Sequence, residues 1–136
     1  MRKLIVTAGT IGVLLSGPVA HAHHPFAADY DANKEVTLKG RVVQFMWANP
    51  HASIDLEGRT STGEAGQWSV ELGSVADLTR SGWKKESVKV GDQILIEGWL
   101  AKADKTHANA KLVRTPDGTT LSAASSFYAE DHGEGH

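Results

Sequence analysis

Short runs of alternating apolar and polar residues constrain the fold of this chain more than any other feature of its sequence. The stretches 52–57, 68–72, 94–100 and 108–112 each place apolar side chains at every second position. Successive side chains of a strand point to opposite faces, so each run predicts a strand with one buried face. The chain is therefore expected to be mainly β.

The longest apolar run, residues 36–47, changes phase part-way. Val36 to Val42 alternate on one face, and the pattern then continues one residue out of step from Val43, close to Gly40. An extra residue that shifts the phase beside a glycine is typical of a β-bulge, which bends a strand and redirects its faces. This run predicts a long bent first strand that contributes to both halves of a small barrel.

A short helix is predicted between the third and fourth strands. Ser74 with Asp77 three residues later fits a helix N-cap, and Gly82 suits the left-handed residue that ends a helix. The Asp-Gly pair before 119–121 predicts a turn and a short last strand. Five or six strands with one helix in this position match an OB-like Greek-key barrel, and another small barrel or a sandwich is the alternative.

The N-terminus has the features of a signal peptide, residues 1–22. Arg2 and Lys3 precede an apolar run of about 12 residues, which is shorter than the roughly 20 that a membrane-spanning helix needs. Ala20-His21-Ala22 then gives the small-x-small pattern that signal peptidase reads. Export to the periplasm or beyond is therefore expected, with cleavage after Ala22.

Removing 22 of the 136 residues leaves a mature chain of 114. Residues 23–124 are predicted to form one barrel domain with an irregular N-terminal arm over 23–34, followed by a flexible polar tail over 125–136. With Arg2 and Lys3 removed, 12 basic residues face 16 acidic ones, a net charge of −4. This balance argues against a nucleic-acid binder, which needs a basic surface. No later segment is apolar enough to span a membrane.

The sequence contains no cysteine and no catalytic motif. The absence of cysteine excludes a thiolate nucleophile, an Fe–S centre and a zinc–thiolate site. Ser74 lacks the G-x-S-x-G context of a nucleophile elbow, and no phosphate-binding or dinucleotide-binding loop is present. The protein is therefore expected not to be an enzyme.

Four histidines suggest a metal site: His23, His24, His51 and His107. After cleavage, the free amine and imidazole of His23 form a bidentate chelate, since an α-amine titrates close to neutral pH. The imidazole of His51, or else that of His107, would complete a nitrogen site that suits copper as Cu(II). His24 offers another chelate through its amide and imidazole, whereas Pro25 rules out the common chelate built on a third-position histidine.

Ordinary structural roles compete with this metal hypothesis. His23 and His24 could be solvated residues at a chain end, and His51 could form a hydrogen bond across its turn. His132 and His136 are expected to be incidental residues of the tail.

The four tryptophans could line a ligand groove or fill the core: Trp47, Trp68, Trp83 and Trp99. Trp68 is in phase with the apolar side of its strand and is expected in the core, and Trp83 is expected to close one end of the barrel. Trp47 precedes Asn49 and His51 in the turn after the first strand. These three residues are the candidate ligand-binding group.

Eight short sequence motifs occur along the chain in the same order as in a known protein family. They lie at 23–28, 30–34, 36–40, 47–51, 71–74, 78–83, 89–92 and 108–110. They include His-His-Pro-Phe-Ala-Ala at the start of the mature chain and Trp-Ala-Asn-Pro-His at 47–51. On these segments the chain resembles the exported domain-of-unknown-function family DUF6152, from His23 to about Ala123. Pro25 departs from the pattern, because the family more often has serine there. The resemblance implies an exported barrel-like domain and assigns no function.

Two functions are consistent with these observations. The first is a non-enzymatic binding module of the periplasm or secreted space, which would hold a small ligand or an exported protein partner at its barrel face and the Trp47–His51 turn. The second is a copper-binding protein built on His23, either a carrier or a redox centre.

Overall fold

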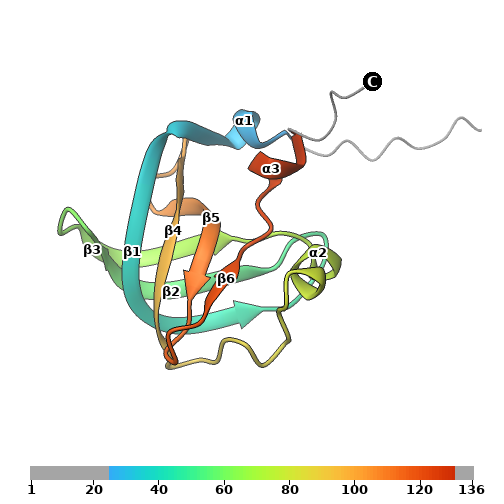
Figure 1. The fold of residues 1–136 in the computed structure, drawn as a ribbon. Helices are drawn as coiled ribbons and strands as arrows, with labels where there is room; N and C mark the ends of the chain where they lie inside the picture. Colours follow the sequence, from blue (N-terminus) through green and yellow to red (C-terminus); the bar gives the residue numbers. More distant parts are fainter. Residues whose placement is uncertain (1–24, 131–136) are drawn as a thin grey trace, which may run out of the picture.

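The computed structural model describes residues 25–130 as six strands and three short helices (Figure 1). The strands are β1 (Tyr30–Met46), β2 (Ser53–Thr60), β3 (Ala65–Glu71), β4 (Gln93–Ala101), β5 (His107–Arg114) and β6 (Thr120–Ser122). The helices are α1 (Phe26–Asp29), α2 (Val75–Arg80) and α3 (Ser126–Glu130).

The strands form one sheet that nearly closes on itself. Their order is β3-β2-β1-β4-β5-β6, with antiparallel neighbours throughout. A short parallel pairing of β3 with β5 joins the two sides of the sheet, so that five strands form a near-closed ring. The predicted mainly β fold, with a short helix between the third and fourth strands, is confirmed.

Strand β1 bends around the ring and belongs to both of its sides. It pairs with β4 through residues 35–41 and with β2 through residues 38–46. The register with β2 slips between Val42 and Gln44, which is the predicted bulge. Figure 1 shows β1 running along one side of the molecule and then turning across its base. The bulge allows one strand to cover the core from two directions.

The core lies inside the ring and consists of side chains that face inward from each of its strands. Its fully buried members include Leu38, Val42, Ile54, Leu56, Val70, Ile96, Ala108 and Val113. Trp68 belongs to this core, as predicted. Trp83 is also buried, and its indole Nε1 donates a hydrogen bond to the carbonyl oxygen of Ser122 at 2.7 Å. A buried indole N–H needs such a partner, so this bond fixes Trp83 against β6.

Helix α2 forms where the capping residues predicted it. The hydroxyl of Ser74 accepts a hydrogen bond from the backbone N–H of Asp77 at 3.1 Å, which satisfies one of the free amides of the first turn. Leu78 is fully buried against the core. Gly82 follows the helix with φ of +93°, a conformation that glycine adopts without strain.

The expectation of an irregular arm over 23–34 is wrong for the described part of that segment. Phe26 begins α1, and β1 starts at Tyr30. Phe26 and Tyr30 are buried together with Trp99 in a second, smaller apolar cluster. The packing of these aromatic rings orders a stretch whose composition alone suggested a turn. The signal peptide and His23 and His24 lie outside the described residues.

The expectation of a flexible tail from residue 125 is also wrong over its first six residues. Phe127 in α3 packs on Trp99, with ring centroids 4.6 Å apart, and on Phe26 at 5.2 Å. Helices α1 and α3 therefore meet at one end of the ring (Figure 1). His132 and His136 lie outside the described residues. Within residues 25–130, no helix is long and apolar enough to cross a membrane.

Two strand boundaries differ from those predicted. The alternation predicted strands over 52–57 and 68–72, but β2 extends to Thr60 and β3 begins at Ala65, which leaves a short turn. In the pairing of β4 with β5, the register slips between Glu97 and Gly98 and skips Lys111. Consequently Val113, and not Leu112, faces the core. A bulge of this kind shifts the alternation that the sequence pattern relies on.

Gly98 offers a test of how tightly β4 and β5 pack. A Cβ atom at this position would lie 2.0 Å from the carbonyl oxygen of Asn109, whereas one at Gly66 would meet no atom within 4 Å. We expect Gly98→Ala to lower the free energy of unfolding by about 1–3 kcal/mol, as forced overpacking does. Gly66→Ala should stay within about 0.5 kcal/mol of the wild type. Urea unfolding measures both, and equal effects would contradict this packing.

Candidate functional site

Glu71 lies at the end of β3, on the outer face of the ring. Its neighbours Val70 and Leu72 are fully buried, so strand alternation turns Glu71 outward. The parallel pairing of β3 with β5 places Glu71 opposite Asn109. A carboxylate with 35% of its side chain exposed is thus held where the ring closes.

Tyr30, the first residue of β1, donates its hydroxyl hydrogen to Glu71 Oε2 at 2.8 Å. Its ring stacks on Phe26 with 5.5 Å between centroids, and the residue is only 7% exposed. Burial, followed by the hydrogen bond to Glu71 and the charge of that carboxylate, raises the pKa of Tyr30 well above the usual value for tyrosine. Tyr30 is therefore a neutral hydrogen-bond donor at physiological pH.

His51 contacts the other oxygen of the same carboxylate. Its ring nitrogen Nδ1 lies 3.1 Å from Glu71 Oε1 and 3.1 Å from the carbonyl oxygen of Leu72. A backbone carbonyl can only accept a hydrogen bond, and so can an ionised carboxylate. We therefore assign the proton of the neutral imidazole to Nδ1, which donates it to the carbonyl oxygen of Leu72 and lies beside the Glu71 carboxylate.

This assignment leaves Nε2 of His51 with a free electron pair. Nε2 lies across the ring from Nδ1, and 38% of the His51 side chain is exposed. A histidine whose Nδ1–H is held by a carboxylate or a carbonyl is the arrangement that orients imidazole ligands in metal sites. Chemically, His51 can act as a metal ligand or as a hydrogen-bond acceptor.

Behind Tyr30 lies a buried polar pair. Asn109 is completely buried, and its Oδ1 accepts a hydrogen bond from the hydroxyl of Ser125 at 2.6 Å. Its amide nitrogen Nδ2 has no hydrogen-bond partner within residues 25–130. The Asn109 side chain also acts on the Tyr30 hydroxyl and partly opposes the rise in its pKa. One polar row thus runs from the residue before α3 to the turn after β1. It consists of Ser125, Asn109, Tyr30, Glu71 and His51.

Comparison with known proteins assigns the chain to a family. The model of DUF6152, a family of unknown function, matches residues 12–110, which is most of the chain. This chain belongs to the DUF6152 family. No significant match was found among curated proteins or among solved structures. The resemblance noted in the sequence is therefore confirmed, and the matched segment of this DUF6152 protein contains Tyr30, His51, Glu71 and Asn109.

The turn between β1 and β2 holds the three residues predicted to bind a ligand. Trp47 is half-buried, and its ring packs against Phe45 with centroids 5.9 Å apart. Asn49 is exposed, and its side chain forms no hydrogen bond with any residue from 25 to 130. Of the three, His51 alone joins the polar row, so the turn supplies one oriented functional group.

His107, the second candidate ligand in the domain, has different partners. Its Nδ1 lies 2.9 Å from Asp104 Oδ2. Hydrogen bonds from Thr106, and to a smaller extent from His107, keep the pKa of Asp104 below its usual value. His107 borders a shallow hollow of about 360 Å³ that also includes Asp55 and Ser69. The structure therefore places His107 beside the loop before β5, outside the polar row.

No metal centre is complete within the described residues. Among residues 25–130, no three histidine, aspartate or glutamate side chains gather closely enough to hold a metal ion. His51 and His107 each pair with one carboxylate of their own. The candidate ligands His23 and His24 lie outside the described residues, immediately before Pro25.

Tyr30, Glu71, Asn109 and Ser125 were not among the residues predicted for the site. Tyr30 and Glu71 are separated by 41 positions, and Asn109 and Ser125 by 16. One signal was available: Asn109 is a polar residue between two alanines of a buried strand. A buried amide generally requires a partner, which points to a polar contact at this position.

The buried hydroxyl of Tyr30 predicts how stability depends on alkaline pH. The pKa of Tyr30 is higher in the folded protein than the roughly 10 of an unfolded tyrosine. Its stabilising contribution is therefore complete below about pH 10 and is lost as the pH rises toward the folded-state pKa. Urea unfolding at increasing pH should show a steeper loss of stability for the wild type than for Tyr30→Phe. Tyr128→Phe, at an exposed position, should follow the wild type, and equal slopes for all three proteins would contradict the prediction.

Proposed function

We propose that this DUF6152 protein is an exported, non-enzymatic binding module that holds a Cu(II) ion at His51. One observation carries the proposal: His51 Nδ1 faces two hydrogen-bond acceptors, Glu71 Oε1 and the carbonyl oxygen of Leu72, each at 3.1 Å. This contact reserves Nε2 for an external electron-pair acceptor. A metal ion is such an acceptor, and a carboxylate behind the imidazole increases the basicity of the ligand.

The finer fold in this proposal is an OB-type Greek-key barrel. The support is the order of the ring, β1-β2-β3-β5-β4, together with the parallel β3–β5 pair and the helix between β3 and β4. In small barrels of this type, ligands bind on the outer face and the loops beside it. His51 lies in the loop between β1 and β2, at the edge of that face.

The export step in this proposal rests on the N-terminal sequence. The positive residues, the apolar run and Ala20-His21-Ala22 together have the form of a cleavable signal peptide. Cleavage after Ala22 creates a free α-amine on His23. The periplasm or the secreted space is therefore where the complete ligand set would exist.

The N-terminal histidines are the proposed further ligands, because they precede the helix whose aromatic cluster leads to Glu71 and His51. Pro25 directly precedes α1, whose Phe26 stacks on Tyr30, and Tyr30 contacts Glu71 beside His51. His24 and His23 precede Pro25, and two residues of extended chain span roughly 7 Å. In this proposal the His23 amine and imidazole complete a nitrogen site with His51 Nε2. His107 is the less favoured third ligand because it lies outside the polar row.

Copper is favoured over other first-row ions by the donor set. An amine and imidazoles supply nitrogen only, and Cu(II) has the highest affinity of the divalent first-row ions for such donors. The chain has no cysteine to supply the thiolate of a zinc–sulfur or iron–sulfur site.

A small organic ligand or an exported protein partner is the alternative occupant of the Trp47–His51 turn. The geometry favours the metal because the ring of Trp47 packs edge-on against Phe45. Within residues 25–130, the oriented group that this turn offers is the imidazole of His51.

Titration of the exported, processed protein with Cu(II) tests the proposal. N-terminal mass spectrometry first establishes that the chain begins at His23. We expect His51→Ala to weaken copper binding by at least tenfold, because it removes an oriented ligand. His107→Ala tests the other imidazole, and His132→Ala is the matched control in the tail. If His51→Ala and His132→Ala have equal effects, binding is adventitious and the proposal is wrong.

Glu71→Gln tests the carboxylate that orients the imidazole. Residues that hold a metal ligand in place typically contribute roughly 10- to 100-fold to metal affinity. We expect Glu71→Gln to weaken copper binding within this range. Asp55→Asn makes the same chemical change on the outer face of β2, where Asp55 is half-buried, and should leave affinity unchanged. Isothermal titration calorimetry compares the two variants, and equal affinities would contradict an orienting role for Glu71.

A further inference from the structure

We infer that Tyr30 is a positioning residue that fixes the Glu71 carboxylate beside His51 Nδ1 and thereby strengthens the preference for the imidazole form that leaves Nε2 available. This inference rests on the proposed binding role of His51, and it assigns the control of that role to the start of β1. The observation behind it is the shared carboxylate, with Tyr30 on Oε2 at 2.8 Å and His51 on Oε1 at 3.1 Å.

Glu71 needs such a restraint because of its exposure. With 35% of its side chain exposed, a glutamate on a strand face is free to rotate toward water, and its contact with His51 would then compete with solvent. The hydroxyl of Tyr30 binds one oxygen from the buried side, and this contact turns the other oxygen outward to His51. The histidine is itself 38% exposed and cannot supply that restraint alone.

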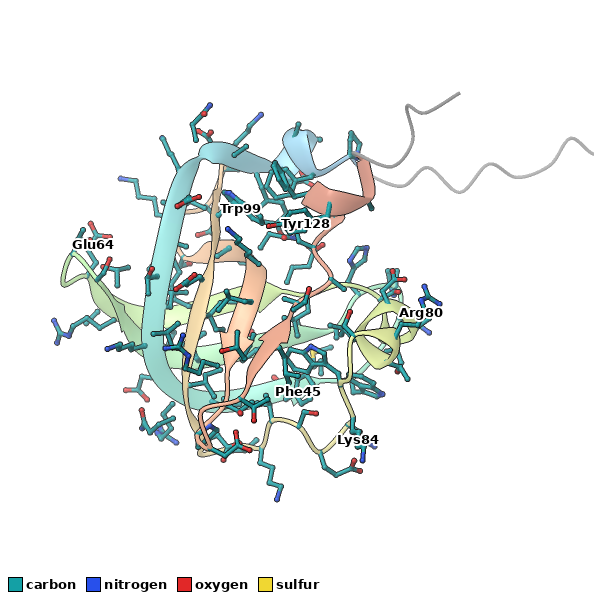
Figure 2. All side chains as sticks on the ribbon, viewed as in Figure 1. Phe45, Glu64, Arg80, Lys84, Trp99 and Tyr128 are labelled. Carbon is teal, nitrogen blue, oxygen red and sulfur yellow. The ribbon has the colours of Figure 1, made fainter. Side chains whose placement is uncertain are left out.

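Tyr30 can fix Glu71 because it is fixed itself. Its ring stacks on Phe26, which in turn meets the edge of Trp99 with centroids 5.3 Å apart. Phe127 in α3 closes the same cluster. In Figure 2 the labelled side chains of Trp99 and Tyr128 lie together beneath α1 and α3. Rings packed on several sides keep a single rotamer, so the hydroxyl has a defined position.

The buried amide of Asn109 extends the row behind Tyr30. Its oxygen accepts from Ser125, which leaves its nitrogen as a donor, and that nitrogen is fully buried without a partner within residues 25–130. A buried donor without an acceptor is destabilising, so a nearby acceptor is strongly favoured. The Tyr30 oxygen, whose hydrogen is directed to Glu71, retains lone pairs for this purpose.

The donors in this row all point the same way. Ser125 donates to Asn109, Asn109 has a free N–H on the side of Tyr30, and Tyr30 donates to Glu71. A hydrogen bond from Asn109 Nδ2 to the Tyr30 oxygen would join the two observed bonds into one chain, in which each bond polarises the next. Such a chain would connect Ser125, directly before α3, through Tyr30 and Glu71 to the His51 ring.

Tyr30→Phe in the full, processed chain tests the inference, because it removes the hydroxyl and keeps the ring. The ¹⁵N chemical shifts of the His51 ring report which nitrogen carries the proton, without any metal. We expect the variant to have a weaker preference for Nδ1–H, which then rests on the Leu72 carbonyl alone, and to bind Cu(II) roughly tenfold more weakly. Tyr128→Phe, an exposed tyrosine of the same aromatic cluster, should change neither quantity.

A purely structural role for Tyr30 gives a different result. If Tyr30→Phe lowers stability but leaves the His51 ring shifts as in the wild type, the inference is wrong. If Tyr30→Phe does not fold, Ser125→Ala replaces it, and unchanged ring shifts in that variant overturn the inference. If the shifts change but neither the wild type nor any variant binds copper, the proposed function fails while the positioning role of Tyr30 holds.

Discussion

The parallel pairing of β3 with β5 is the contact on which the rest of the structure depends. It joins only Ser69–Glu71 to His107–Asn109, yet it turns an open six-stranded sheet into a near-closed ring. The inward residues of the ring gain a common core because of this closure. The outward residues gain neighbours from a strand far away in the chain. Glu71 and Asn109 are far apart in the sequence, and they come together because of this pairing.

The polar row beside the β3–β5 pairing combines groups that are each common when they occur alone. A half-exposed carboxylate, a buried phenol and a buried amide are common in small domains, and each is usually a matter of stability. Here one carboxylate is shared by a buried donor and an exposed imidazole. Because Tyr30 is fixed in the interior, the carboxylate that it holds helps to orient the His51 ring at the surface. A binding site requires such an orientation.

The features predicted correctly from the sequence are those with a local cause. Alternation predicted the strands, the phase slip predicted the bulge at Val43, and the cap at Ser74 predicted α2. The order in residues 25–34 and in α3 could not be predicted this way, because it comes from aromatic rings that meet only in the folded chain. The same limit applies to the site. His51 was recognisable as a candidate, but its partner Glu71 depends on strand register, which a single sequence does not specify.

The packing of α1 and α3 on the same residue, Trp99, has a mechanical consequence. Both ends of the domain are anchored on one small aromatic cluster, and each anchoring helix has only four or five residues. A pulling force applied across the two ends would load this cluster first and peel it open one contact at a time, before it reached the long ladder between β1 and β4. Because Tyr30 belongs to the cluster, tension on the chain would release Glu71 while the barrel itself was still intact.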